Sequence, residues 1–569
     1  MADADYQALE FPYRPHPDAR AAMPARHPVV VVGAGPVGLT AAIDLAGRGL
    51  PVVLLDDDCR LSTGSRAICF AKRTLEIWDR LGLGQRMADK GVSWNVGRIF
   101  FQDGEVWRFD LLPEPGHRRP AFINLQQYYC EGYLLEHAAR RPGIDLRWKH
   151  KVVGARALAD GVELTVETPD GTHALHADWV LACDGSRSPM RRILGREAHG
   201  RVFRDRFLIA DIRMHADFPP ERWFWFDPPF HPGQSVLLHR QPDDIWRVDF
   251  QMGWDADPVE AVKPENVLPL LRALLGPRAE FQLEWVSLYT FACERMDCFR
   301  HGRVLFAGDA AHRVSPFGAR GANSGVQDAE NLAWKLEAVI SGAAPEALLD
   351  TYCLEREYAA DENILNSSRA TDFITPKSEV SRLFRNTVLK LARDHPFARA
   401  LVNSGRLSVP SAYRTSPLNT PDADRFEGPM APGTVALDAP VLRNGRPDWW
   451  LAQLPGDFML AVFCDDPRDA DRGALEDLAR DDVPVRTILV RGAESPPGAH
   501  EDGIAQVVDA EGWLARRYDG RPGTCYLIRP DQHVAARWRR FEPRRVRAAR
   551  DCALARGDAH DFPASGARA

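Results

Sequence analysis

The sequence predicts an α/β protein with three parts: a Rossmann-like βαβ domain, an antiparallel-sheet domain interleaved with it, and a separate C-terminal α/β domain. Residues 28–55 contain two aliphatic runs joined by a glycine-rich turn and a helical pattern. Residues 195–290 are rich in aromatic, strand-like segments separated by Pro, Gly and Asp. A stretch rich in Pro, Ser, Thr and Asp at 405–432 precedes a final block with strands of its own.

The first predicted element is a buried strand over residues 29–32, which are four consecutive valines. A β-branched run without polar alternation is typical of a parallel strand that is covered on both faces. Apolar residues at helical spacing follow over residues 37–48, and a second aliphatic run at 52–55 predicts the next strand. Together these segments form a βαβ unit.

The turn between the first strand and the helix has the pattern Gly-x-Gly-x-x-Gly at Gly33, Gly35 and Gly38. The first glycine permits the tight turn, the second lets the backbone approach a pyrophosphate, and the third allows close helix–strand packing. The N-terminus of the helix that follows offers unpaired N–H groups and the positive end of its dipole to phosphate. Asp56, at the end of the second strand, is placed to accept hydrogen bonds from ribose hydroxyls. The sequence therefore predicts a dinucleotide site at this turn.

A second loop that leads into a helix lies much later in the chain. A third aliphatic strand ends at Asp309, and the segment from Pro316 to Asn323 then opens a helix that extends to about residue 341. The N–H donors at the start of that helix suit a group that becomes anionic, such as a reduced flavin. Asp309 is placed to accept hydrogen bonds from a sugar-alcohol chain.

These motifs, in this order, resemble those of the group A FAD-dependent aromatic hydroxylases. This flavoprotein monooxygenase family includes phenol hydroxylase and 3-(3-hydroxyphenyl)propanoate hydroxylase. The matching segments are Gly33–Gly38, Ser65–Ala67, Gln127 with Glu131, Cys183–Ser188 and Gly308–Asn323. The resemblance covers residues 28–404. The chain departs from it at Ala319-Arg320-Gly321, where many members have Gly-Gln-Gly.

The resemblance implies which residues bind FAD. The implied set is Gly33, Gly35, Pro36, Gly38, Asp56, Arg66, Gln127, Val153, Asp184, Asp309, Pro316, Gly321, Ala322 and Asn323. Asp309 would bind the ribityl chain, and the backbone of residues 321–323 would face the pyrimidine edge of the flavin. Without the resemblance, Asp184 is more typical of a helix cap.

The resemblance also implies a reaction, in which NADPH or NADH reduces FAD, and O2 then forms a flavin C4a-hydroperoxide that hydroxylates a phenolic ring. A small aromatic substrate would bind between the flavin and the antiparallel sheet. The assigned residues are Trp225, Arg247, Gln251 and Phe317 for substrate binding, and His239, Arg247 and Pro316 for catalysis. His239 is the candidate phenol base and Arg247 the candidate carboxylate partner, although arginines in strands are more often surface residues.

Other functions remain open at this stage. A flavoprotein reductase or dehydrogenase could share the fold, and the hydroxylated ring could be an N-heteroaromatic or a polyketide. A flavin-dependent halogenase is disfavoured, because the family's Trp-x-Trp-x-Ile-Pro element is matched only by Trp223–Pro228 with Asp227 in place of the isoleucine. An FAD-binding protein without enzymatic activity is a further alternative.

The predicted division of the chain is a 1–27 extension, a 28–194 FAD-binding part, a 195–290 substrate sheet, a 291–404 second FAD-binding part with helices, a 405–432 linker, a 433–545 thioredoxin-like domain and a 546–569 flexible tail. The resemblance supplies the thioredoxin-like assignment. Cys464 stands where a redox thioredoxin has Cys-x-x-Cys, and the second cysteine is missing, so we expect a structural or dimer-stabilising domain. A chain ending near residue 430 is then expected still to bind FAD.

Composition excludes several other classes. The 569 residues carry a net charge of −7, without the basic surplus of a nucleic-acid-binding protein. The apolar run 28–45 is interrupted by glycines and Asp44, so we expect no membrane span. The ten cysteines lack metal-ligand spacing, which predicts no metal site and a cytoplasmic protein. A homodimer is left open.

Overall fold

The computed structural model describes residues 6, 9–62, 67–402, 407, 409–493 and 504–557. Of the seven predicted segments, only the 195–290 sheet lies wholly within these ranges, and the other six fall partly outside them. Arg66 falls outside them altogether.

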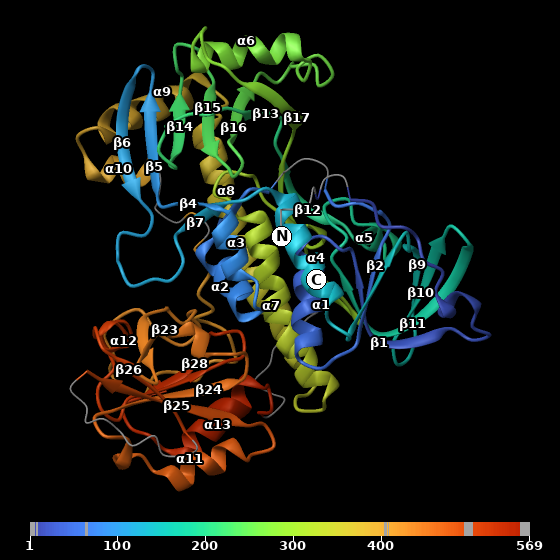
Figure 1. Cartoon of the computed structure of the whole chain (residues 1–569), viewed down its shortest axis with the longest axis vertical. Helices are drawn as coiled ribbons and strands as arrows, with labels where there is room; N and C mark the ends of the chain where they lie inside the picture. The colour runs from blue at the N-terminus through green and yellow to red at the C-terminus, as the bar shows by residue number, and fades with distance from the viewer. Residues whose placement is uncertain are drawn as a thin grey trace.

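The first sheet contains the predicted βαβ unit (Figure 1). Its strands, in spatial order, are β19 (Arg300–His301), β20 (Val304–Phe306), β11 (Gly171–Ala182), β1 (Ala25–Val32), β2 (Val52–Asp56) and β8 (Ile144–Trp148), with β10 (Val162–Thr168) and β9 (Lys151–Ala157) extending from β11. β1 lies in the middle and pairs in parallel with β11 and with β2. The valines of β1 are buried on both faces, which confirms the interpretation of the unalternated run.

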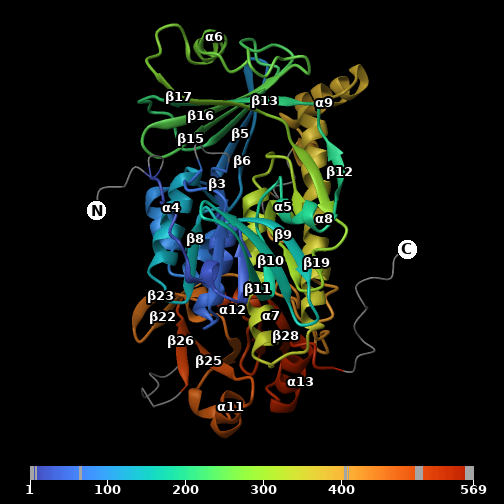
Figure 2. The same cartoon turned by 90° about the vertical axis from the view of Figure 1, so that its right-hand side faces the viewer.

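Helices cover this sheet and connect it to the rest of the molecule. They are α1 (Pro36–Gly47), α2 (Lys72–Arg80), α3 (Gly84–Lys90), α4 (Gln127–Ala139), α5 (Pro189–Ile193), α7 (Gly321–Ile340) and α8 (Leu348–Ile374). α7 packs against α1, and α8 extends along the molecule from the first sheet to the second (Figure 2). The predicted helices at 37–48 and 323–341 correspond to α1 and α7.

The second sheet forms the upper layer in Figure 1. Its strands, in order, are β17 (Gln282–Tyr289), β13 (Arg206–Arg213), β16 (Ile245–Met252), β15 (Ser235–Arg240), β14 (Arg222–Phe226), β5 (Val96–Phe101) and β6 (Gly104–Asp110). Three helices flank it: α6 (Pro264–Leu275), α9 (Glu379–Ala392) and α10 (Pro396–Val402). The prediction placed this sheet at 195–290 and missed β5 and β6. β5 joins it by pairing in parallel with β14, a partner more than a hundred residues away that no local pattern indicates.

Two three-stranded sheets lie between these layers. One contains β3 (Cys69–Ala71), β7 (Phe122–Asn124) and β4 (Val92–Trp94), and the other contains β12 (Ala198–Val202), β18 (Ala292–Met296) and β21 (His312–Arg313). They connect the polypeptide segments that cross from the first sheet to the second.

The C-terminal domain is a third, mixed sheet with its own helices (Figure 1). Its strands are β23 (Arg446–Trp449), β22 (Pro440–Arg443), β26 (Ala505–Asp509), β25 (Val485–Gly492), β24 (Phe458–Cys464), β27 (Cys525–Ile528) and β28 (Val534–Trp538), and its helices are α11 (Arg472–Ala479), α12 (Trp513–Tyr518) and α13 (Pro543–Ala553). Burial raises the pKa of Cys464 to about 11, which disfavours the reactive thiolate. The thioredoxin-like class of this domain stays a prediction.

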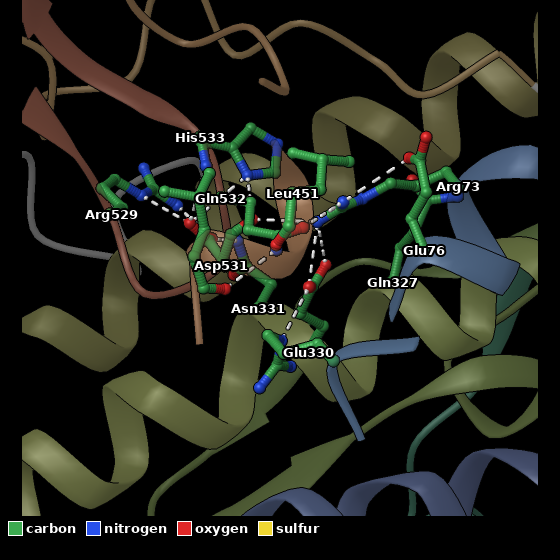
Figure 3. A network of polar contacts seen from close by, with 12 residues as sticks. Arg73, Glu76, Gln327, Glu330, Asn331, Leu451, Arg529, Asp531, Gln532 and His533 are labelled. Atoms are coloured by element: carbon green, nitrogen blue, oxygen red, sulfur yellow. Dashed lines mark hydrogen bonds and ion pairs between the residues drawn. The ribbon is translucent and has the colours of Figure 1, made fainter. Parts of the chain in front are cut away.

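A buried network of charged residues joins the C-terminal domain to α2, α7 and α8 (Figure 3). Arg529 donates to Glu355 of α8 and to Asp531, and all three side chains are fully buried. Arg73 of α2 binds Glu330 of α7 and also donates to Gln532. Buried hydrogen bonds therefore connect the C-terminal domain to the core of the rest of the protein.

Within the described ranges, none of the helices combines the length and the apolar character that crossing a bilayer requires.

Candidate functional site

The turn between β1 and α1 is packed too tightly for a side chain at two of its glycines. Gly33 has φ = 104°, in the left-handed region, and a Cβ there would lie 2.5 Å from the carbonyl oxygen of Cys183. A Cβ at Gly38 would lie 1.9 Å from the carbonyl oxygen of Gly33. Both glycines are therefore required by contacts within the protein itself, as the turn pattern predicts.

Gly35 differs from its two neighbours in the motif. Apart from Gly35 itself and its two chain neighbours, no protein atom lies within 4 Å of the position that its Cβ would occupy. Gly35 caps the N-terminus of α1 and Pro36 begins the helix, so the first unpaired N–H groups of α1 are next to this open space. A phosphate group would find both room and donors here, which fits the predicted pyrophosphate site.

Asp56 lies beside the same turn. Its carboxylate accepts hydrogen bonds from the backbone N–H groups of Ala34 (2.6 Å) and Asp58 (2.9 Å). Burial raises the pKa of Asp56 to about 6 despite these two donors. Each carboxylate oxygen has a further lone pair that could accept from a ribose hydroxyl.

A buried aspartate, Asp328 of α7, positions the loop that follows β20. It accepts hydrogen bonds from the backbone N–H of Gly308 (2.8 Å) and from Arg356 (2.5 Å), and its carboxylate lies 2.7 Å from Nε2 of His312. Burial alone would raise the pKa of Asp328, but His312 and Arg356 hold it well below its usual range. Sequence reasoning missed Asp328 and Arg356, because a charged residue inside a helical pattern predicts an exposed position.

Asp309, between the anchored residues of this loop, is exposed. Its carboxylate lies 4.0 Å from the position that a Cβ on Gly321 would take, so it faces the first turn of α7. A carboxylate in this place can bind hydroxyl groups of a ligand held between the two helix N-termini.

We expect Asp309→Ala to weaken FAD binding by about 10- to 150-fold, the equivalent of one charge-assisted hydrogen bond of roughly 1.5–3 kcal/mol. Because Asp309 is exposed, we expect the substitution to weaken FAD binding more than it lowers the stability of the apoprotein to urea. Fluorescence titration of the apoprotein with FAD measures the effect, and Asp297→Ala, at an exposed aspartate, is the matched control. Equal FAD affinity in the two variants would contradict the assignment.

The start of α7 is secured by Asn323. Its side-chain oxygen accepts from the backbone N–H of Ala71 (2.8 Å) and from the Thr74 hydroxyl (2.6 Å), and its amide donates to the carbonyl oxygen of Ala319 (2.6 Å). This holds Ala319 at φ = 52°, an unusual conformation for a residue with a side chain. The Asn323 side chain is thus occupied within the protein, and only the backbone of residues 321–323 remains to face a flavin.

Three other residues of the implied FAD set have clear positions. Gln127 accepts from the backbone N–H of Ala67 and donates to Ser62, which fixes both ends of the segment that contains Arg66. Asp184 accepts from Ser188 (2.6 Å) and from the N–H of Met190 (2.8 Å), so it stabilises the start of α5. Val153 is a partly exposed residue of β9. Their roles toward FAD stay predictions.

A cavity of about 440 Å³ lies where the loop before α7 meets the second sheet. Its walls come from β5, β6, β14, α8, α10 and the loop itself. They include Ile99, Phe109, Phe224, Phe226, Phe317 and Phe373, together with Arg222, Arg320 and Arg369. Its size and largely apolar lining are typical of a site for a small organic ligand.

The structure brings some of the predicted substrate residues to this cavity and not others. Phe317 lines it, and the exposed Pro316 precedes Phe317 in the loop. Trp225 lies on the opposite face of β14, where it stacks on Phe100, because alternate residues of a strand point to opposite faces. Gln251 accepts a hydrogen bond from the N–H of Ser235.

The two predicted catalytic residues of the sheet are also outside the cavity lining. Arg247 forms a two-point ion pair with the buried Asp211, with both contacts at 2.7 Å. His239 is buried with its Nε2 at 4.0 Å from Asp249, and burial lowers its pKa well below the usual value. The assignment of Arg247 as carboxylate partner is thus not supported by its position. Arg222, which sequence reasoning did not select, lines the cavity instead.

Within the described part of the chain, Cys298, Cys353 and Glu357 form one group with ligand atoms within 4.8 Å of one another. The predicted absence of a metal site stays untested.

Comparisons with known proteins agree with this geometry. The model of the FAD binding domain family matches residues 26–367. The chain is 30% identical over 527 residues to the 6-methylpretetramide 4-monooxygenase of Streptomyces rimosus, which covers 90% of this chain and 91% of that protein. It is 30% identical over 385 residues to a 3-(3-hydroxy-phenyl)propionate/3-hydroxycinnamic acid hydroxylase of Mycolicibacterium smegmatis, which covers 68% of each.

Two solved structures share the fold over nearly the whole length. The flavin-dependent monooxygenase PieE, in complex with FAD and substrate, superposes with a TM-score of 0.79 at 22% identity over 94% of this chain and 100% of that one. Aklavinone-11 hydroxylase, in a ternary complex with FAD and aklavinone, superposes with a TM-score of 0.75 at 23% identity over 93% and 99%.

Proposed function

From the premise that this chain belongs to the FAD-binding-domain family of flavin-dependent monooxygenases, we propose that it hydroxylates a phenolic aromatic substrate with NADPH or NADH and O2. The enzyme is an FAD-dependent oxidoreductase. The nicotinamide, the oxygen and the position of hydroxylation belong to the proposal.

The proposal depends on the relative positions of three features of the site. The phosphate turn at Gly35, the carboxylate of Asp309 and the cavity beside Phe317 are arranged around the N-termini of α1 and α7. The first two features fit the two halves of FAD, and the third lies against the same loop that would border the flavin. A ligand in this cavity would therefore be close to the redox-active end of the cofactor.

When bound, FAD supplies the reduction by nicotinamide and the activation of dioxygen. The protein supplies the surroundings for that chemistry. The aromatic walls of the cavity exclude water and bind a planar ring, and the Asp328 network keeps the loop at Gly308 and His312 in one place. Histidine, aspartate and glutamate are absent from the described residues that line the cavity, whereas three arginines are present. Positive charge would favour the phenolate over the phenol without a dedicated base.

Two substrate classes have support for the ring to be hydroxylated. The cavity volume of about 440 Å³ is within the range for drug-sized ligands, which favours a polyketide-like, multi-ring substrate over a single phenol. Similarity to 6-methylpretetramide 4-monooxygenase supports the same choice, and similarity to the hydroxyphenylpropionate hydroxylase supports the smaller ring.

Anaerobic flavin reduction tests the proposal against a dehydrogenase. We expect NADPH or NADH to bleach the bound flavin, and an aromatic ligand to accelerate that step. Reduction of the flavin by the aromatic compound itself, without nicotinamide, would instead identify a dehydrogenase. A reductase would be reduced at the same rate with and without aromatic ligands.

We also propose a homodimer and a cytoplasmic location. α9 and α10 expose large apolar side chains, among them Val380 (77% exposed), Leu383 (69%) and Phe397 (65%), which a second subunit could cover. All ten cysteines are free thiols, which supports a reducing compartment. Light scattering of the purified protein tests the oligomeric state.

A further inference from the structure

Arg222 is a buried arginine that forms no ion pair with any of the residues that the structure describes. It is 9% exposed, and within the described residues no hydrogen bond or ion pair joins its guanidinium to another side chain. Burial lowers its pKa, and the titratable groups that act on it are Cys69, Asp249 and Tyr289. Burial raises the pKa of the Cys69 thiol and of the Tyr289 hydroxyl, so both are neutral near pH 7. The Asp249 carboxylate forms no ion pair with Arg222.

The strand that holds Arg222 directs it into the cavity. In β14 the buried residues alternate with the less buried ones, and Arg222, Phe224 and Phe226 share one face. All three residues line the cavity, whereas Trp223 and Trp225 belong to the other face.

The rest of the cavity wall adds positive charge and no negative charge. Arg369 and Arg320 also line it, and Arg320 donates to Asn363 at 2.9 Å. Aspartate and glutamate are absent from the described lining residues. Arg247, a buried arginine of the same sheet, is accommodated in the usual way, because Asp211 neutralises its charge. The guanidinium of Arg222 is therefore left for a ligand.

We propose that Arg222 binds an oxyanion of the substrate, a carboxylate or an ionised phenol or enol, and so makes the enzyme selective for acidic aromatic compounds. This inference rests on the proposed function in one respect, since it takes the bound ligand to be the substrate of the hydroxylase. A bound oxyanion would pair a charge that is costly to bury alone, and it would orient the ring against the aromatic walls.

Ligand binding by purified holoenzyme tests the inference, with the flavin absorbance change as the signal. The probes are 6-hydroxy-2-naphthoic acid and its methyl ester, which differ in the carboxylate and share the phenol. The variants are Arg222→Gln, Arg222→Lys and, as a matched control, Arg213→Gln, at an exposed arginine in the same sheet that pairs with Glu284.

We expect Arg222→Gln to raise the Kd of at least one probe about tenfold or more, with Arg222→Lys in between and Arg213→Gln unchanged. A loss limited to the acid identifies the oxyanion as the carboxylate. An equal loss for both probes, with a higher pKa of the bound phenol in the variant, identifies it as the phenolate.

Stability separates a ligand-binding role from a structural one. Because Arg222 is unpaired and buried, Arg222→Gln should unfold at the same or a higher urea concentration than the unsubstituted enzyme, with the same FAD content. Lower stability, Kd values within about twofold for both probes, or failure of both probes to bind the unsubstituted enzyme would overturn the inference.

The outcome is separable from that of the proposed function. If neutral aromatics are hydroxylated equally well by Arg222→Gln, the hydroxylase stands and the inference fails. If acid binding depends on Arg222 but no oxygen is inserted, the binding site stands and the hydroxylase fails.

Discussion

Replacing Arg529 by alanine should lower the free energy of unfolding by about 3–5 kcal/mol, the usual effect of removing one partner from a buried ion pair. The expected size follows from the contacts. Arg529 donates to Glu355 at 2.6 and 3.0 Å and to Asp531 at 3.0 and 2.5 Å, and none of the three side chains is exposed. Alanine would leave Glu355 with Lys335, at 2.7 Å, as its remaining cation.

Urea unfolding followed by flavin and tryptophan fluorescence measures this loss. The control is Arg480→Ala, which removes an exposed pair with Glu476 and should cost at most about 1 kcal/mol. Equal stability of the two variants would mean that the network contributes little. Because the C-terminal domain and α8 are joined here, both fluorescence signals should change in one transition for the unsubstituted protein.

The contacts of this buried network change the result that we expect from truncating the chain near residue 430. A chain ending near residue 430 lacks Arg529, and it also exposes Trp334 and Leu348, which pack in one apolar cluster with Phe458 and Leu460. Every FAD motif precedes that point, but the helices that carry them use the C-terminal domain as part of their core. The truncated chain is therefore expected to be unstable, whatever its FAD motifs.

The second large effect separates two glycines of one motif. Gly38→Ala should destabilise the apoprotein, by about 1–3 kcal/mol or more, since its Cβ would lie 1.9 Å from a carbonyl oxygen. Gly35→Ala should leave the apoprotein as stable as the unsubstituted chain. Its Cβ would meet no atom within 4 Å beyond its own residue and its two chain neighbours, and its φ of −74° suits alanine.

Gly35→Ala, the variant that should keep its stability, is the one that we expect to lose FAD affinity. If the pyrophosphate lies against Gly35, a methyl group there displaces it from the N–H groups of α1, and we expect affinity to fall about 10- to 150-fold. Reconstitution of the apoprotein with FAD, alongside urea unfolding without FAD, gives both quantities. Unchanged FAD affinity in Gly35→Ala would place the cofactor elsewhere.

The local part of the site could be predicted from the sequence. The glycine spacing, the valine run of β1 and the strand–loop–helix pattern around Asp309 each depend on neighbours a few residues away, and the structure confirms these elements. The strand pattern of Arg222–Phe226 was also correct.

The cavity beside Phe317 could not be predicted in this way. It forms from segments near residues 100, 225, 317, 370 and 400, and their meeting depends on pairings such as β5 with β14. Arg222 and Arg247 look alike in sequence, as arginines in aromatic-rich strands. Only the tertiary structure shows that Asp211 neutralises one of them and that the other faces the cavity. The same holds for Asp328, whose partners come from two separate segments, the loop after β20 and α8.

Incorporation of oxygen from ¹⁸O2 into the product tests most directly the claim that the protein is an aromatic hydroxylase. Holoenzyme, NADPH or NADH and an aromatic compound that accelerates flavin reduction are incubated under ¹⁸O2, and the product is analysed by mass spectrometry. The account predicts a hydroxylated ring that carries one oxygen atom from ¹⁸O2. A product without that label, or oxidation of the nicotinamide with no hydroxylated product for any accelerating aromatic compound, would contradict it.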